Sequence, residues 1–230
     1  MFFFMLGHGT SKRSSSIPVT VSGINTAVAI GAGSYFSCAL LADGTVRCWG
    51  FFSDTQLPFS INGISNAVSI DTGRSHACAV LSDGTIKCWG DNQDGQLGNT
   101  SGANSWEPVT VLGINTAVSV STGAHHTCAR LADNTVRCWG DNFWGQLGMG
   151  LSSISTAVSI NAGYVHTCVV LADGTMRCWG NNYHGENGNS LFFNLATPMV
   201  TLGYHPLNWT SSTPTVASVD MSGKAQALSA

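Results

Sequence analysis

One short sequence unit occurs four times in this chain of 230 residues. The third copy reads HTCARLADNTVRCWGDNFWGQLG, from His126 to Gly148. The first cysteines of the copies stand at positions 38, 78, 128 and 168, so the spacing is 40, 50 and 40 residues. A repeat of this period is typical of propellers and solenoids, in which each repeat is one small supersecondary unit.

Each copy predicts a β-hairpin. In the first copy, the apolar run Cys38–Leu41 and the β-prone run Thr45–Trp49 are separated by Ala42-Asp43-Gly44. A three-residue link that contains glycine is typical of a hairpin with a bulge, and we expect Gly44 to adopt a positive φ. In the third copy this position is Asn134, a residue type that also tolerates a positive φ.

The three-residue loop also fixes the hairpin register. It places Leu40 opposite Val46 and Cys38 opposite Cys48, in a non-hydrogen-bonded pair with the Cα atoms about 4.5 Å apart. That distance lies within the range of a disulfide. The same register uses all eight cysteines as four pairs, which are Cys38 with Cys48, Cys78 with Cys88, Cys128 with Cys138, and Cys168 with Cys178.

Two other roles for the cysteines are reduced thiols in the core and zinc ligands. Free cysteine packs well as a small apolar side chain. Zinc ligands are usually two to four residues apart, whereas nine residues separate the two cysteines of each pair. We expect disulfides, each stabilising by a little under ~3 kcal/mol, and therefore an oxidising compartment.

The composition limits the class of partner. Charged residues make up only 9% of the chain and the formal net charge is −3, so we expect no nucleic acid partner. No apolar run approaches the length of a membrane span. The apolar start Met1–Leu6 is too short for a signal sequence, so we expect any export signal to lie outside this chain, which we take to be part of a longer protein.

The repeats divide the chain into segments. Residues 1–23 are interpreted as the tail of a preceding repeat, because Leu6–Ile24 can be laid against Leu97–Ile114. Four repeats follow, at 24–63, 64–113, 114–153 and 154–203. Each predicts up to four short strands, as in one propeller blade. The repeat at 114–153 has lost the Pro-Val-Thr-Val segment, so we expect it to lack its outer strand.

Residues 204–230 differ in character from the repeats. They predict a strand that ends at Trp209, a strand Val216–Val219, a turn at 220–223 and a strand from Lys224. We interpret this segment as a fragment of a β-sandwich. The whole chain is therefore predicted to be all-β.

Repeated polar and aromatic residues are candidates for metal-binding or structural roles. His76, His126 and His166 each stand two residues before a cysteine, and we expect them to make structural hydrogen bonds between strands or blades. A ring of metal ligands would need a repeated acidic neighbour, which is absent from the sequence. The recurring tryptophans are expected to pack between blades, and they are Trp49, Trp89, Trp139 and Trp179.

Asp91 and Asp94 resemble part of a calcium loop, but Gly95 stands where that loop needs an oxygen ligand, so we expect turn residues. No nucleophile, base or phosphate-binding motif stands out. The sequence therefore gives no catalytic, metal or cofactor-binding residue, and we expect a protein that is not an enzyme and has no cofactor.

The repeats resemble the regulator of chromosome condensation (RCC1) repeat family, of bacterial type. The resemblance rests on the series Gly-x-x-His-x-Cys-Ala-x-Leu-x-Asp-Gly-Thr-x-x-Cys-Trp-Gly-x-Asn-x-x-Gly-Gln-Leu-Gly at Gly73–Gly98 and covers about residues 6–203. It implies a seven-bladed β-propeller, of which this chain holds about four to five blades. We expect further blades of the same polypeptide, or self-association, to cover the open ends.

The segment WTSSTPTVASVDMSGKAQALSA from Trp209 resembles a truncated bacterial immunoglobulin-like domain of group 2. Together the two resemblances imply a bacterial protein that is extracellular or on the cell surface. We expect a non-enzymatic binding scaffold that holds a protein or glycan through the loops of the propeller rims. A secreted bacterial propeller that inhibits β-lactamase by protein contact is a precedent for this function.

Two alternatives remain. The founding family member implies guanine-nucleotide exchange on a small GTPase, which needs a reducing compartment and a complete propeller. An enzyme whose active residues lie in blades outside this chain is the other.

Overall fold

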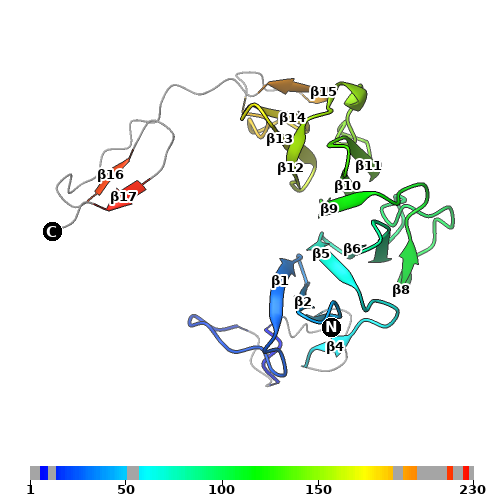
Figure 1. Ribbon diagram of the computed structural model, residues 1–230, viewed down its shortest axis with the longest axis vertical. Coiled ribbons are helices and arrows are strands. Elements are labelled where there is room, and N and C mark those ends of the chain that lie inside the picture. Colours follow the sequence, from blue (N-terminus) through cyan, green and yellow to red (C-terminus); the bar gives the residue numbers. More distant parts are fainter. Residues whose placement is uncertain are drawn as a thin grey trace.

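The computed structural model describes residues 6–9, 14–50, 57–188, 194–200, 217–219 and 225–227. The regular structure in these ranges is β, with one short 3-10 helix. Four antiparallel sheets follow one another as the blades of an incomplete propeller and form an open arc (Figure 1). The predicted all-β propeller is therefore confirmed. In the described ranges no helix combines the length and the apolar character needed to cross a membrane.

Within each blade the strands run in order from the inside of the arc to the outside. Blade 1 holds β1 (Ala27–Ala32), β2 (Phe36–Leu41), β3 (Val46–Gly50) and β4 (Phe59–Ser60). Blade 2 holds β5 (Ala67–Thr72), β6 (His76–Leu81), β7 (Ile86–Gly90) and β8 (Ser105–Thr110). Blade 3 holds β9 (Ala117–Thr122), β10 (His126–Leu131) and β11 (Val136–Gly140). Blade 4 holds β12 (Ala157–Ala162), β13 (His166–Leu171), β14 (Met176–Gly180) and β15 (Leu195–Val200).

The hairpin register is the one that the sequence predicts. Leu40 pairs with Val46 and Cys38 with Cys48, and the equivalent pairs recur in the other three blades. Gly44 has a φ of 79° and Asn134 one of 62°, as the bulge requires. In the turn of the first hairpin, the Asp43 carboxylate accepts hydrogen bonds from the hydroxyl and the backbone N–H of Thr45, which lower the pKa of Asp43.

A disulfide joins each opposed cysteine pair, with Cα–Cα distances of 4.0 to 4.1 Å. The pairs are Cys38–Cys48, Cys78–Cys88, Cys128–Cys138 and Cys168–Cys178. These are the pairs that the register argument gives. Each disulfide ties the second strand of its blade to the third and leaves the first and outer strands outside the closed loop.

Blade 3 has three strands, whereas blades 1, 2 and 4 have four. The predicted loss of its outer strand is confirmed. The 3-10 helix η1 (Leu151–Ser153) lies in the short connection to blade 4, where the other repeats have their outer strand. As a consequence β11 forms the outer edge of its sheet.

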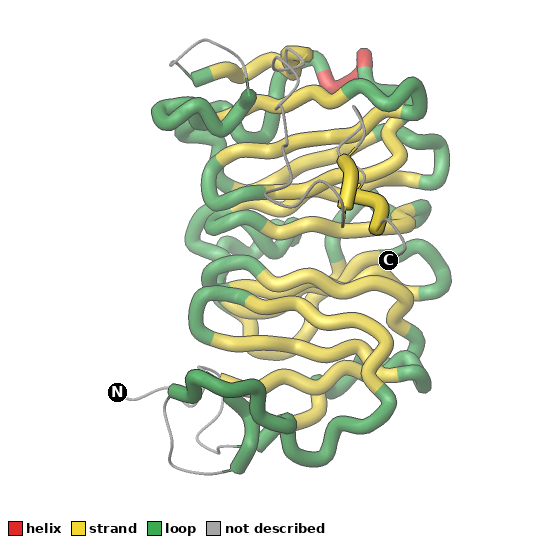
Figure 2. The backbone as a smooth tube through the Cα atoms, turned by 90° about the vertical axis from the view of Figure 1, so that its left-hand side faces the viewer, coloured by secondary structure: helices red, strands yellow, loops and turns green. Residues whose placement is uncertain are grey.

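The apolar core lies between blades. The first cluster joins the Cys38–Cys48 disulfide of blade 1 to Ile64, Ile70 and Trp89 of blade 2, and the next two interfaces repeat this arrangement. Ile70 is 8% exposed inside an interface, whereas its counterpart Ile30 in blade 1 is 66% exposed. Stability therefore comes from the stacking of blades, which Figure 2 shows as successive layers of strands.

The segment before blade 1 makes the contact that its sequence match suggests. The Ser22 N–H donates to the Gly7 carbonyl at 2.9 Å, as the Leu112 N–H donates to the Gly98 carbonyl at 3.0 Å. In the tail, β16 (Ala217–Val219) and β17 (Ala225–Ala227) form an antiparallel pair. Trp209 and the predicted turn at 220–223 lie outside the described residues.

Candidate functional site

The propeller has two faces on which loops gather (Figure 2). The loop face holds the connections between first and second strands (33–35, 73–75, 123–125, 163–165) and the turns after the third strands (91–98, 141–148, 181–188). The two sets are joined by backbone bonds such as Asp91 N–H to Ser75 C=O, at 2.9 Å. The hairpin face, at the other end, holds the loops 42–44, 82–84, 132–134 and 172–174.

The repeated histidines lie beneath the loop face and join neighbouring blades. The Nε2 atom of His76 is 2.9 Å from the Thr127 hydroxyl, and Nε2 of His126 is 3.0 Å from the Thr167 hydroxyl. Because the Thr127 hydroxyl donates its proton to the Gln96 carbonyl at 3.0 Å, His76 must donate through Nε2. The predicted role as a hydrogen bond between blades is confirmed for both histidines.

These buried imidazoles are neutral. Burial lowers the pKa of His76 to about 3, with a smaller contribution from the charges of His126 and His125. Burial also lowers the pKa of His126 to about 4, against the opposing effect of Asp141. Such groups hold the blades together and are poorly placed for proton transfer at neutral pH.

In blade 1 the histidine position holds Phe36, which is also buried. His166, in blade 4, is only half-buried, and burial lowers its pKa. The histidine position is thus a buried structural one in blades 1, 2 and 3.

A groove of about 400 Å³ runs along the loop-face end of the inner strands. Asp71 lines this groove, and its carboxylate accepts hydrogen bonds from the Ser121 hydroxyl at 3.1 Å and the Thr122 N–H at 2.8 Å. Ser121 in turn accepts from the Ala162 N–H at 3.0 Å. These contacts link blades 2, 3 and 4, so the polar groups of the groove bind one another.

The groove depends on glycine at the end of each inner strand. A Cβ atom on Gly33 would lie 2.3 Å from the Gly73 carbonyl oxygen, and one on Gly73 would lie 2.1 Å from the Gly123 carbonyl oxygen. Glycine is required here because neighbouring backbones approach closely, and not because of an unusual φ.

A chain of three side chains crosses the loop face between blades 2 and 3. The Arg74 Nη1 atom is 3.1 Å from His125 Nε2, and His125 Nδ1 is 3.0 Å from an Asp94 carboxylate oxygen. Because the guanidinium can only donate, Nε2 of His125 is the acceptor of this bond. Asp91 accepts from the Gln93 N–H at 3.4 Å, as expected of a turn residue.

Within the ranges that the structure describes, no three His, Cys, Asp or Glu side chains come together as a metal site.

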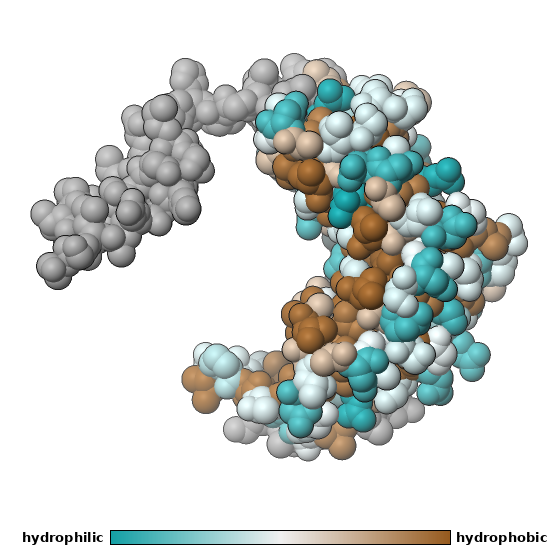
Figure 3. Space-filling model, in the orientation of Figure 1, coloured by the Kyte–Doolittle hydropathy of each residue, from teal (hydrophilic) through white to brown (hydrophobic). Residues whose placement is uncertain are grey.

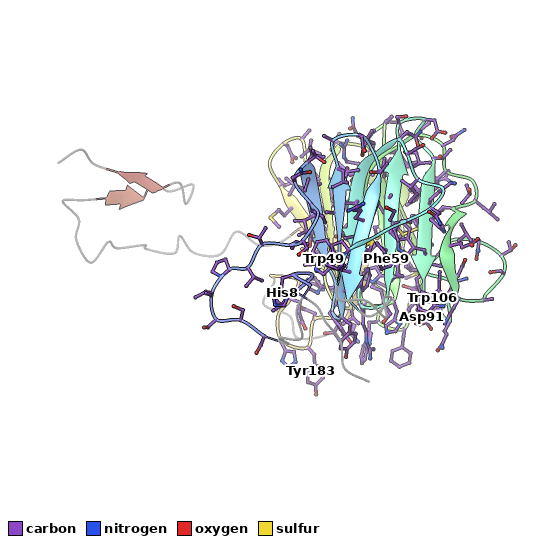
Figure 4. All side chains as sticks on the ribbon, turned by 90° about the horizontal axis from the view of Figure 1, so that it is seen from below. His8, Trp49, Phe59, Asp91, Trp106 and Tyr183 are labelled. Atoms are coloured by element: carbon purple, nitrogen blue, oxygen red, sulfur yellow. A yellow bond between two sulfur atoms is a disulfide. The ribbon has the colours of Figure 1, made fainter. Side chains whose placement is uncertain are left out.

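The turns after the third strands carry exposed aromatic side chains. Phe143 is 80% exposed and its ring makes an edge-to-face contact with Trp144, with centroids 4.9 Å apart. Tyr183 is 73% exposed, makes the equivalent contact with His184, and projects beyond the blades at the end where Asp91 lies (Figure 4). These residues were not predicted from the sequence, although they fill the two variable positions of the turns Asp-Asn-x-x-Gly-Gln-Leu-Gly in blade 3 and Asn-Asn-x-x-Gly-Glu-Asn-Gly in blade 4.

The turns that hold the aromatic residues are fixed by side-chain hydrogen bonds. The Asn142 side-chain oxygen accepts from the Leu147 N–H at 3.0 Å, and the Gln146 side-chain oxygen accepts from the Trp144 N–H at 2.8 Å. In blade 4, the Asn182 side-chain oxygen accepts from the Asn187 N–H at 2.8 Å. The exposed rings therefore stand on preorganised supports.

The two faces differ in charge. In the described loops of the loop face there are one guanidinium, that of Arg74, and four carboxylates, which are those of Asp91, Asp94, Asp141 and Glu186. Toward the hairpin face, one aspartate in each hairpin loop is balanced by one basic residue on the third strand, as with Asp43 and Arg47. Arg47 and Lys87 donate there to the carbonyls of Gly23 and Gly63. The loop face is thus acidic and aromatic.

The concave side of the arc has apolar surface along the inner strands (Figure 3). The second position of each inner strand is an exposed valine, and these are Val28, Val68, Val118 and Val158.

The repeats match the profiles of a known repeat family. One profile described as the regulator of chromosome condensation (RCC1) repeat matches residues 27–56, 67–96, 117–146 and 157–186, and a second of the same description matches 83–130. Together the four matches of the first profile cover more than half of the chain. A search of curated proteins found no match.

Solved structures share the fold at low identity. Yeast RCC1 (Prp20), in a complex with Kap60, is 21% identical with a TM-score of 0.69, over 81% of this chain and 50% of that one. Human WBSCR16 is 18% identical with a TM-score of 0.66, over 80% and 54%. The ectodomain of the Physcomitrella patens receptor kinase CR4 is 25% identical with a TM-score of 0.54, over 71% and 44%. The chain spans about half the length of these structures.

Proposed function

The chain belongs to the regulator of chromosome condensation (RCC1) repeat family, and on that basis we propose that it is a non-enzymatic scaffold that binds a protein partner through its loop face. The observation that carries this proposal is the pair of exposed aromatic turns at Phe143-Trp144 and Tyr183-His184. Aromatic side chains on rigid supports offer a large contact area at a small cost in conformational entropy, and they are enriched among the residues that dominate binding energy.

The charge of the loop face indicates what kind of surface the partner presents. Four carboxylates beside exposed rings complement a surface that presents lysine or arginine, through ion pairs and cation–π contacts. We therefore infer a partner with a basic, partly apolar surface in preference to a glycan. The non-enzymatic role agrees with the buried neutral histidines and with Asp71, whose carboxylate is hydrogen-bonded between blades.

The proposal includes export of the protein to the cell surface or the extracellular space. Four disulfides support this location, because disulfides persist in oxidising compartments. It also includes a bacterial source and an immunoglobulin-like domain that begins in the tail, for which the sequence resemblance and the β16–β17 pair are the support.

Guanine-nucleotide exchange is the alternative function. A related yeast structure concerns binding of Prp20p to Gsp1p and histones. The four disulfides favour the exported scaffold over this function, because an exchange factor for a small GTPase works in a reducing compartment.

The test uses three forms of the full chain, immobilised and incubated with the surface-protein fraction of its host. The forms are wild type, Phe143→Ser with Tyr183→Ser, and Leu112→Ser, which changes an exposed apolar residue that follows β8 and lies outside the two aromatic turns. We expect proteins retained by wild type and by the Leu112 variant to fall at least tenfold on the double variant. Retention should also weaken with added salt, which screens surface charges.

Equal retention on all three forms would show that the loop face is not the binding surface. If deglycosylation of the fraction abolishes retention, the ligand of the loop face is a glycan and not a protein surface.

A further inference from the structure

The outer edge of β11 in blade 3 is an open strand edge. In blades 1, 2 and 4 the third strand pairs on its outer side with β4, β8 or β15, whereas among the described strands β11 pairs only with β10. Figure 1 shows no strand outside β11, between β8 and β15. An unpaired edge presents backbone N–H and C=O groups in the geometry that a further strand needs.

The backbone groups that face outward can be identified from the register. In blade 2 the Val111 N–H donates to the Ile86 carbonyl, and in blade 1 the Ile61 N–H donates to the Val46 carbonyl, both at 2.9 Å. The equivalent carbonyl in blade 3 belongs to Val136, and no backbone N–H in the described part of the chain bonds to it. Because outward groups alternate along a strand, those of Cys138 and Gly140 face the same way.

The side chains along β11 are uncovered as well. Cys138 and Trp139 are partly exposed, whereas the equivalent Cys88 is fully buried and Trp89 is 1% exposed. The disulfide of blade 3 therefore has an apolar surface that lacks the cover found in blade 2.

No strand in the described part of the chain closes this edge, and the element that lies beside β11 is η1. The connection from blade 3 to blade 4 turns away, because the Met149 N–H donates to the Ala196 carbonyl of β15. Leu151 of η1 packs on the apolar cluster between blades 3 and 4, and its carbonyl accepts from the Ile154 N–H. Leu151 thus supplies an apolar side chain to this interface, but the described part of the connection adds no strand to β11.

We propose that β11 binds an extended segment of a partner protein, which adds to blade 3 as an antiparallel outer strand. The other blades show the chemistry of such an occupant, because the residue opposite the outer cysteine is Phe59, Val109 or Met199. The occupant therefore carries an apolar residue opposite Cys138 and offers backbone groups to Cys138 and Gly140. This is strand addition, in which main-chain bonds give affinity and alternate side chains give specificity. It is independent of binding at the loop face.

The first experiment uses the full chain labelled with ¹⁵N and a synthetic peptide with the sequence of residues 105–112, SWEPVTVL, which is the outer strand of blade 2. Saturating peptide should slow hydrogen exchange of the Cys138 and Gly140 amides at least tenfold. Exchange of the Cys48 and Cys88 amides, which already have outer strands, should not change.

Two N-methylated peptides are matched controls. N-methylation at the position of Val109, whose N–H faces the sheet, should abolish the protection of Cys138. N-methylation at the position of Thr110, whose N–H faces away, should leave at least half of it.

A second variant supplies the missing strand covalently. Residues 99–113, inserted in place of residues 149–153, should slow exchange of the Cys138 amide without peptide and remove the response to peptide.

Three results would overturn the proposal. The unmethylated peptide leaves exchange at Cys138 unchanged, or the two methylated peptides behave alike, or protection without peptide rises with protein concentration. The last result would make a second copy of the chain the occupant.

Discussion

The contact between blades 1 and 2 differs from the contacts between blades 2 and 3 and between blades 3 and 4. At the second contact His76, Thr127 and the Gln96 carbonyl form a buried hydrogen-bonded set. At the first contact the histidine position is Phe36 and the threonine position is Ala77, and both are buried in an apolar cluster. The same backbone arrangement is thus stabilised in two chemical ways.

The tryptophans also differ between the contacts, in the hydrogen bond that the indole N–H makes. Trp139 and Trp179 each donate their indole N–H to a glutamine carbonyl of the preceding blade, at 2.9 Å. The indole nitrogen of Trp89 is buried and has no hydrogen-bond partner in the described part of the chain. In the first repeat the corresponding stretch after Gly50 reads Phe-Phe-Ser-Asp-Thr-Gln-Leu-Pro, without the glycines of the Gly-Gln-Leu-Gly turn, and residues 51–56 lie outside the described residues. At the first contact the histidine and threonine positions are therefore both apolar, whereas the tryptophan is retained with its indole N–H buried.

The largest expected difference between the two kinds of contact is their effect on stability in acid, because only the polar contacts contain a buried histidine. Burial lowers the pKa of His76 to about 3 and that of His126 to about 4, below the usual 6.5, so the unfolded chain binds protons that the folded chain excludes. Stability is present above pH 6.5 and falls as the pH decreases through that value. Between pH 7 and pH 4.5 the loss should be about 2.5 kcal/mol for each histidine, measured by denaturant unfolding.

The control for acid is the variant His76→Phe with Thr127→Ala, which copies the contact between blades 1 and 2. It should lose about 2.5 kcal/mol of the pH dependence and keep the remainder, which belongs to His126 and to the half-buried His166. Stability that is flat between pH 6.5 and pH 4.5 in the wild type would contradict buried neutral histidines.

Removal of one hydroxyl should break the polar contact. Thr127→Val keeps the shape of the side chain but leaves the buried N–H of His76 without an acceptor, and the expected loss is about 2 kcal/mol in the free energy of unfolding. Thr122→Val in the same blade is the matched control, because the Thr122 hydroxyl is buried and has no hydrogen-bond partner among the described residues.

The Thr122 variant should be close to neutral. A similar loss in both variants would mean that the methyl and hydroxyl groups differ only in packing, and the interblade hydrogen bond would then contribute little. His76→Phe with Thr127→Ala should lose less stability than the sum of its single variants, because the singles leave one partner unsatisfied.

Local rules allowed much of the fold to be predicted. The three-residue hairpin loops fix the register that opposes Cys38 and Cys48, and the missing Pro-Val-Thr-Val segment shows that blade 3 lacks an outer strand. The histidine role was also predictable, but its partner Thr127 was not, because blade order in space decides which strand faces which.

The candidate surface was less predictable. Phe143 and Tyr183 stand at positions that vary between repeats, so the repeat pattern gives no reason to single them out. Their importance depends on exposure and on the rigid turns beneath them, which are properties of the folded molecule. The open edge of β11 was predictable from the missing segment, but the path of the connection toward Ala196 was not.

The smallest expected effect distinguishes the two contacts through tryptophan alone. Trp89 and Trp179 are buried to the same extent, at 1% and 0% exposure, but only Trp179 donates its indole N–H, to the Gln146 carbonyl. Replacement by phenylalanine removes the same part of the ring at both sites. Trp179→Phe should therefore cost about 1 kcal/mol more than Trp89→Phe, the net contribution of one hydrogen bond, measured by denaturant unfolding at pH 7. Equal losses would mean that the Trp89 N–H is satisfied after all, and the contact between blades 1 and 2 would then be less different from the others than Phe36 and Ala77 indicate.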